Sequence, residues 1–216
     1  MVLRLAVSYL AALLLALALL PLAGVIALAV RVADGAPVFY RARRVGRGGR
    51  VFEMFKFRTM RAAPGPLITT AQDPRITRLG AWLRRSRLDE LPQLVNVLRG
   101  EMMLVGPRPE SPEYAAHYGA QREAMLALWP GLTDPGTLTF LFLETEIVSR
   151  AADPASAYVH AVMPARNRLS IAYARVATPG QDLRLLGQTV LALASRRRAE
   201  HIGSACLQRF PLEEPP

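Results

Sequence analysis

Residues 5–30 read LAVSYLAALLLALALLPLAGVIALAV, a run of 26 residues without a charged side chain, bounded by Arg4 and Arg31. As one helix the run would be about 39 Å long, against a hydrocarbon core of roughly 30 Å. The stretch therefore predicts an N-terminal helix that enters a membrane or crosses it with a tilt. A secretory signal peptide is disfavoured, because its apolar segment would be far too long.

A proline divides this run. Pro21 has no N–H, and its ring clashes with the carbonyl oxygen four residues back, so it kinks or breaks a helix. We therefore predict a membrane-anchoring helix over residues 1–32 that is broken near Pro21. A helix bent there would dip into one leaflet and return, whereas a straighter one would span, and the sequence leaves both open. Arginines at 31, 41, 43 and 44 place the C-terminal side of the run in the cytoplasm by the positive-inside rule.

The composition is basic and apolar. The 216 residues include 27 Lys+Arg and 17 Asp+Glu, a formal net charge of +10, and 51% are hydrophobic. This is too apolar for a disordered chain and indicates a basic protein that associates with membranes. The single cysteine, Cys206, excludes a disulfide framework or a zinc cluster within one copy. Lys56 is the only lysine in the sequence.

Beyond the apolar run, short elements can be placed from local patterns. Residues 37–41 and 51–57 are typical of short strands, and Gly46-Arg47-Gly48-Gly49 between them predicts a hairpin turn. A phosphate-binding loop is disfavoured, because the Gly-Lys-Ser/Thr ending is lacking. Residues 76–87 form an amphipathic pattern with arginines on the polar face, typical of a helix on an anionic membrane surface or of a core helix with a solvated face. Residues 182–194, followed by three arginines, leave the same two alternatives.

Together these patterns predict a mostly helical α+β fold. The N-terminal membrane helix is followed by a small domain over residues 33–203, which contains the hairpin and the amphipathic helices. The segment over residues 204–216, which ends in Glu-Glu-Pro-Pro, is predicted to be a loosely ordered tail.

An acidic pair stands among the arginines. Residues 88–100 read LDELPQLVNVLRG, in which Asp89 suits a helix N-cap. The alternative is chemical: a carboxylate at a helix N-terminus is held ionised, and Asp89 with Glu90 could hold Mg²⁺ together with substrate phosphates. An ionised aspartate beside a diphosphate can attack phosphorus and form an acyl phosphate. Arg84, and Arg108 in the stiff Gly-Pro-Arg-Pro loop, are placed to clamp phosphate oxygens.

A family resemblance supports the chemical interpretation. In order, the chain contains PVFY (37–40), RVG (44–46), FKFRTM (55–60), DPRIT (73–77), LDELPQL (88–94) and LVGPRP (104–109). This ordered set resembles the bacterial sugar transferases, the monotopic polyprenyl-phosphate phosphoglycosyl transferases, from the first apolar segment to about Asp182. The resemblance implies the minimal form of that family, with a re-entrant membrane helix and a catalytic domain over residues 33–203.

The resemblance implies an initiating step of bacterial glycan synthesis, in which a sugar-1-phosphate passes from a UDP-sugar to polyprenyl phosphate and UMP is released. It implies Mg²⁺ as cofactor, the bacterial inner membrane as location, and its cytoplasmic face as the side of the catalytic domain. Nucleic acid is not an expected partner. The roles implied for single residues are a covalent phosphosugar intermediate on Asp89, metal binding by Glu90, lipid-phosphate binding by Arg84, and phosphate binding by Lys56, Arg58 and Arg108.

The chain departs from the family pattern at several positions. Leu20 precedes Pro21 where serine is frequent, Arg87 replaces a frequent serine, and Val95 replaces a frequent tryptophan. Residues 138–144 are more apolar than the Arg-bearing pattern expected there, which predicts altered sugar and uridine recognition. Two other hypotheses remain: a membrane-anchored basic binding module, and an inactive scaffold of the same family. The sugar, the pathway and the oligomeric state are not predicted.

Overall fold

The computed structural model describes residues 1–65, 69–70 and 73–210. In the described residues, helices surround two small two-stranded sheets, so the predicted mostly helical α+β fold is confirmed. The elements are α1 (Val2–Ala33), β1 (Phe39–Val45), β2 (Val51–Phe57), α2 (Arg78–Ser86), α3 (Gln93–Leu98), β3 (Met103–Val105), α4 (Pro112–Ala115), α5 (Arg122–Ala127), β4 (Gly131–Thr133), α6 (Pro135–Thr139), α7 (Leu143–Arg150), α8 (Pro154–Ala157), α9 (Met163–Val176), α10 (Pro179–Ala194) and α11 (Arg196–Arg209).

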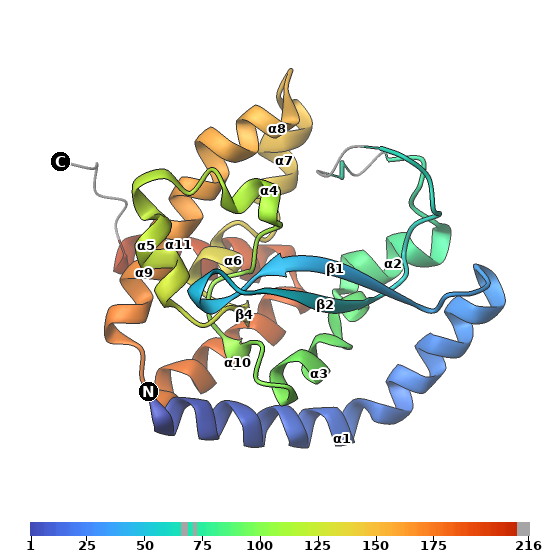
Figure 1. Ribbon diagram of the computed structural model, residues 1–216, viewed down its shortest axis with the longest axis horizontal. Coiled ribbons are helices and arrows are strands. Elements are labelled where there is room, and N and C mark those ends of the chain that lie inside the picture. Colours follow the sequence, from blue (N-terminus) through green and yellow to red (C-terminus); the bar gives the residue numbers. More distant parts are fainter. Residues whose placement is uncertain (66–68, 71–72, 211–216) are drawn as a thin grey trace.

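Helix α1 is long, apolar and continuous. By length and composition it could cross a membrane, and most of its large apolar side chains are exposed. The predicted break at Pro21 is wrong, because the residue lies inside one helix that runs from Val2 to Ala33. Figure 1 shows α1 lying along the domain and then bending toward the β1–β2 hairpin. A proline inside a helix removes one hydrogen bond and bends the axis, which accounts for a bend without a break.

Both ends of α1 contact the folded domain. Near its start, the Arg4 guanidinium donates to both carboxylate oxygens of Asp182 on α10, at 2.7 and 3.0 Å. One turn later, the Ser8 hydroxyl accepts a hydrogen bond from the N–H of Leu104 at 2.8 Å. Near its end, Ile26 and Val30 are buried in a cluster that includes Phe57 and Leu83. The helix is therefore fixed to the domain at both ends.

The predicted hairpin is present. β1 and β2 pair antiparallel, from Phe39 opposite Phe57 to Val45 opposite Val51, and the turn between them contains Gly48 and Gly49 with positive φ. β1 begins and ends later than residues 37–41. A second pair, parallel β3 and β4, was not predicted; each strand has only three residues, too few to show a periodic pattern.

Two predicted boundaries differ from the structure, the start of α2 and the start of the loosely ordered C-terminal tail. α2 begins at Arg78 rather than at residue 76, because Thr77 caps it by accepting a hydrogen bond from the N–H of Gly80 at 2.9 Å. The predicted loose tail over residues 204–216 is wrong as far as Arg209, since α11 continues to that residue with Cys206 buried against the domain. Residues 211–216 lie outside the described residues.

Candidate active site

The acidic pair lies in a short turn between α2 and α3. Asp89 and Glu90 belong to a 3₁₀ turn over Leu88–Glu90, and both are buried. The predicted N-cap role of Asp89 is wrong, because α3 begins only at Gln93 and has no side-chain cap. The turn follows Arg87, the only non-glycine residue with positive φ (56°) in the described part of the chain. This left-handed residue ends α2 and starts the turn that holds the pair.

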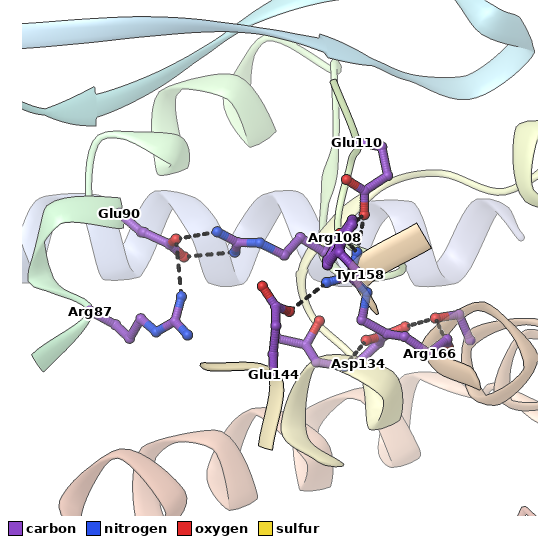
Figure 2. Close-up of polar contacts among 10 residues, drawn as sticks. Arg87, Glu90, Arg108, Glu110, Asp134, Glu144, Tyr158 and Arg166 are labelled. Atoms are coloured by element: carbon purple, nitrogen blue, oxygen red, sulfur yellow. Dashed lines mark hydrogen bonds and ion pairs between the residues drawn. The ribbon is translucent and has the colours of Figure 1, made fainter. Parts of the chain in front are cut away.

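Glu90 is surrounded by cations. The Arg108 guanidinium donates to both of its carboxylate oxygens, at 2.7 Å to Oε1 and 3.2 Å to Oε2. Lys56 Nζ lies 2.9 Å from Oε1, and Arg87 Nη1 lies 3.5 Å from the same oxygen; Figure 2 shows the contacts with Arg108 and Arg87. Burial raises the pKa of Glu90, but Arg108, Lys56 and Arg87 outweigh burial and hold it well below the usual value. Glu90 is therefore an ionised centre that organises the cations.

Asp89 is in the opposite situation. Its side chain is buried, and its Oδ1 atom has no hydrogen-bond partner among the described residues. Burial raises the pKa of Asp89; Lys56 acts against burial, while Glu90 adds to it. The sequence argument that a helix end would hold Asp89 ionised is thus not supported. A carboxylate with few hydrogen bonds and a raised pKa is a better nucleophile than a fully solvated one.

Lys56 and Arg84 complete the group around the pair. Burial lowers the pKa of Lys56 to about 8, although Glu90 acts in the opposite direction. Arg84 lies in the last turn of α2, where burial lowers its pKa and Asp89 is the strongest opposing charge. The structure therefore brings Lys56 (β2), Arg84 (α2) and Arg108 (the loop after β3) to the acidic pair.

Arg58 is not part of this group. Its guanidinium donates to the carbonyl oxygens of Gly35 at 2.7 Å and Ala36 at 2.6 Å, and also to that of Asp34. These carbonyl groups follow the C-terminus of α1. The structure therefore places the Arg58 side chain in a contact with the loop between α1 and β1, and its phosphate-binding role stays a prediction.

A network that was not predicted, buried except at Glu144, lies next to Arg108 (Figure 2). Arg166, on α9, forms ion pairs with Glu110 and with Glu144, the latter at 3.0 Å, and donates to the Tyr158 hydroxyl at 2.6 Å. Tyr158 in turn donates to Glu110 at 2.6 Å. Glu110 follows the Pro-Arg-Pro motif and could have been found from it, but no local pattern marks Arg166 as its partner. The network fixes the loop that carries Arg108.

The pair offers a donor set for Mg²⁺. A carboxylate can accept about four hydrogen bonds, whereas Glu90 Oε2 accepts one and Asp89 Oδ1 accepts none from the described residues. Mg²⁺ is usually held by one or two carboxylates together with substrate phosphates, so these oxygens fit it. No group of three or more His, Cys, Asp or Glu side chains with metal-binding geometry occurs among the residues that are described.

Comparison with known proteins identifies the family. The sequence model of the bacterial sugar transferase family matches residues 1–196. The chain belongs to this family. It is 36% identical over 193 residues to the UDP-glucose:undecaprenyl-phosphate glucose-1-phosphate transferase of Caulobacter vibrioides, a match that covers 83% of this chain and 65% of that relative. The resemblance drawn from the ordered motifs is confirmed.

Two other relatives match a shorter region more closely. The UDP-glucose:undecaprenyl-phosphate glucose-1-phosphate transferase of Xanthomonas campestris pv. campestris is 52% identical over 102 residues, which are 45% of this chain and 21% of the relative. The undecaprenyl-phosphate glucose phosphotransferase of Komagataeibacter xylinus is 48% identical over 119 residues, 53% of this chain and 22% of the relative. The matches to these bacterial sugar transferases therefore cover only about a fifth of the relatives' own length.

Proposed function

We propose that the chain is a polyprenyl-phosphate phosphoglycosyl transferase, which moves a sugar-1-phosphate from a UDP-sugar to polyprenyl phosphate and releases UMP. The observation that carries the proposal is the buried, unpartnered carboxylate oxygen of Asp89 next to a Glu90 that is bound by Lys56 and Arg108. The names of the relatives, undecaprenyl-phosphate sugar phosphotransferases, support the same reaction class.

In the first step, an ionised oxygen of Asp89 attacks the phosphorus atom that carries the sugar. A bond forms between this oxygen and phosphorus, the bond from phosphorus to the bridging oxygen breaks, and UMP leaves with the bonding electrons. Burial of Asp89 removes competing water, and the raised pKa makes its oxygen more nucleophilic. Lys56 and Arg108 are the cations placed to stabilise charge that develops on the phosphoryl oxygens.

In the second step, a phosphate oxygen of the polyprenyl phosphate attacks the same phosphorus atom. The new phosphorus–oxygen bond gives the lipid diphosphate sugar, and the bond to Asp89 breaks, which restores its carboxylate. Arg84, beside Asp89, is the cation we assign to the lipid phosphate. Glu90 is the residue that would hold Mg²⁺, whose charge would further neutralise the substrate phosphates.

We further propose that α1 is re-entrant and that the domain lies on the cytoplasmic face of the bacterial inner membrane. The support is the contact of both helix ends with the same domain, through Arg4 with Asp182 at the start and Val30 with Phe57 near the end. A spanning helix would place its two ends on opposite sides of the membrane and would break the Arg4 contact.

A labelling experiment tests this topology. In a Cys206→Ser background, the Val2→Cys variant should be inaccessible to a membrane-impermeant maleimide in intact cells and should react after permeabilisation. A cysteine in the exposed β1–β2 turn, Arg47→Cys, is the cytoplasmic control. Reaction of the residue-2 cysteine in intact cells would overturn the re-entrant arrangement.

The activity is tested by measuring UMP release from a panel of UDP-sugars, with polyprenyl phosphate and Mg²⁺, by the full chain in nanodiscs. We expect one or more donors to support release by the wild type and none to support it in Asp89→Asn. The donor that responds would identify the sugar. Equal release by both proteins would refute Asp89 as the nucleophile, and a folded wild type without activity would favour the scaffold or binding-module hypothesis.

A further inference from the structure

Arg44 is a partly buried arginine without a partner among the described residues. It lies on β1, its Nε atom is buried without a hydrogen-bond partner, and its guanidinium forms no hydrogen bond or ion pair with any residue that the structure describes. Burial lowers the pKa of Arg44, and Arg108 lowers it further by repulsion. A guanidinium nevertheless stays protonated in proteins, so an unpaired positive charge is held there.

The position of Arg44 is fixed from two sides. Across the hairpin it lies opposite Phe52, and the N–H of the next residue, Val45, donates to the carbonyl oxygen of Glu110 at 2.8 Å. This bond joins β1 to the segment that carries Arg108. Arg108 is the strongest charged influence on Arg44, and it also binds Glu90 through both Nη atoms. Arg44 therefore belongs to the same group of charges as the acidic pair.

An unpaired, partly desolvated cation costs stability unless an anion compensates it. The cations near the acidic pair outnumber the carboxylates. Of the described carboxylates that interact with the Arg44 cation, Glu90 is already bound by Arg108 and Lys56, and Glu113 is exposed to solvent. The excess suits a ligand with more than one phosphate group. A planar guanidinium on a strand is suited to hold a phosphate through two parallel hydrogen bonds.

We propose that Arg44, together with Arg108, forms a second phosphate subsite, which binds the nucleotide-side phosphate of the sugar donor. The inference rests on the proposed function, because it assumes a nucleoside diphosphate sugar as donor. The phosphorus attacked by Asp89 lies among Lys56, Arg108 and the acidic pair, and the second phosphate of the donor extends from Arg108 toward Arg44.

Ligand-induced thermal stabilisation tests the subsite without turnover. The full chain in detergent micelles is titrated with UDP and, separately, with a short-chain polyprenyl phosphate, using wild type, Arg44→Gln, Arg44→Lys and Arg43→Gln. Arg43 is the matched control, since it is the adjacent arginine of β1 and is exposed. We expect the apparent Kd for UDP to rise roughly ten- to a hundredfold in Arg44→Gln and to a smaller extent in Arg44→Lys, because charge-assisted hydrogen bonds are lost.

The same variants separate a binding role from a structural one. Removing an unpaired buried charge should leave the Tm without ligand unchanged or higher, whereas loss of a structural residue would lower it. Binding of UDP to Arg44→Gln as tightly as to Arg43→Gln would overturn the subsite, and so would a lowered Tm without ligand. A weakening confined to the lipid phosphate would overturn the assignment to the donor. If the wild type turns over but wild type and Arg44→Gln bind UDP equally well, this inference is refuted and the proposed function is not.

Discussion

Two adjacent carboxylates are expected to have opposite effects on stability. Glu90→Gln and Asp89→Asn each remove one negative charge and keep the shape of the side chain. Glu90 has a pKa held well below its usual value by Arg108, Lys56 and Arg87 despite burial, whereas burial raises the pKa of Asp89. The ionised form of Glu90 therefore stabilises the fold, and the ionised form of Asp89 destabilises it.

The magnitude for Glu90 follows from its contacts. Its side chain is 11% exposed and pairs with Lys56 at 2.9 Å and Arg108 at 2.7 Å. Breaking a buried pair by removing one partner costs about 3–5 kcal/mol, and glutamine keeps one acceptor, so we expect a loss near the lower limit. At roughly 2–4 °C per kcal/mol for a chain of this size, the Tm of Glu90→Gln should fall by about 6–12 °C. Asp89→Asn should keep or raise the Tm.

Thermal unfolding in detergent from pH 4 to pH 8 measures both variants. Because the pKa of Glu90 is lower in the folded state than in the unfolded state, its contribution is complete above the unfolded value. It is lost as the pH falls toward the folded value. The Tm difference between wild type and Glu90→Gln should therefore be largest at neutral pH and shrink in acid. A Tm loss in Asp89→Asn as large as that in Glu90→Gln would refute the reasoning for both residues.

Three further results are expected. Burial lowers the pKa of Lys56 to about 8, so wild-type kcat/KM should fall as the pH rises through about 8. In a pH–rate profile, Lys56→Arg should not show this decrease. The same decrease in Lys56→Arg would exclude Lys56 as its origin. Gly80→Ala, whose Cβ would lie 2.0 Å from the Thr59 carbonyl oxygen, should lower stability by about 1–3 kcal/mol in thermal unfolding, whereas Gly187→Ala, with open space around it, should not. Asp182→Asn, which removes the ion pair with Arg4, should speed backbone hydrogen exchange in the first turns of α1 by about tenfold, with α11 as internal control. Unchanged exchange would mean that this ion pair does not hold the helix against the domain.

The sequence predicts the features that depend on local pattern. The apolar run, the hairpin with its glycine turn, and the helix over residues 182–194 follow from hydropathy, turn chemistry and periodicity. The acidic pair with Lys56 and Arg108 is also predicted, through the ordered motifs. These residues come together because β2, the turn after α2 and the loop after β3 converge on one point. The order of the motifs in the sequence does not explain this convergence.

The features that the sequence did not predict depend on the tertiary structure. The capping rule for Asp89 is local, and it fails because the chain makes a separate turn at Arg87 before α3 begins. The ion pair of Arg166 with Glu110 joins residues 56 positions apart, and neither residue has a periodic signal. Arg44 stands in a recognised motif, but only the structure shows that its guanidinium lacks a partner among the described residues.

Arg58 shows how a motif position can serve the fold. In a continued strand, residues 56 and 58 would share one face, which favours a common role for Lys56 and Arg58. β2 ends at Phe57, although the N–H of Arg58 still donates to the Val38 carbonyl oxygen at 2.8 Å, and the Arg58 side chain reaches the carbonyl oxygens after the C-terminus of α1. A cation beside a helix C-terminus also interacts favourably with the helix dipole. Arg58 therefore joins the end of α1 to the strand that carries Lys56, so that α1 and Lys56 keep a fixed spacing.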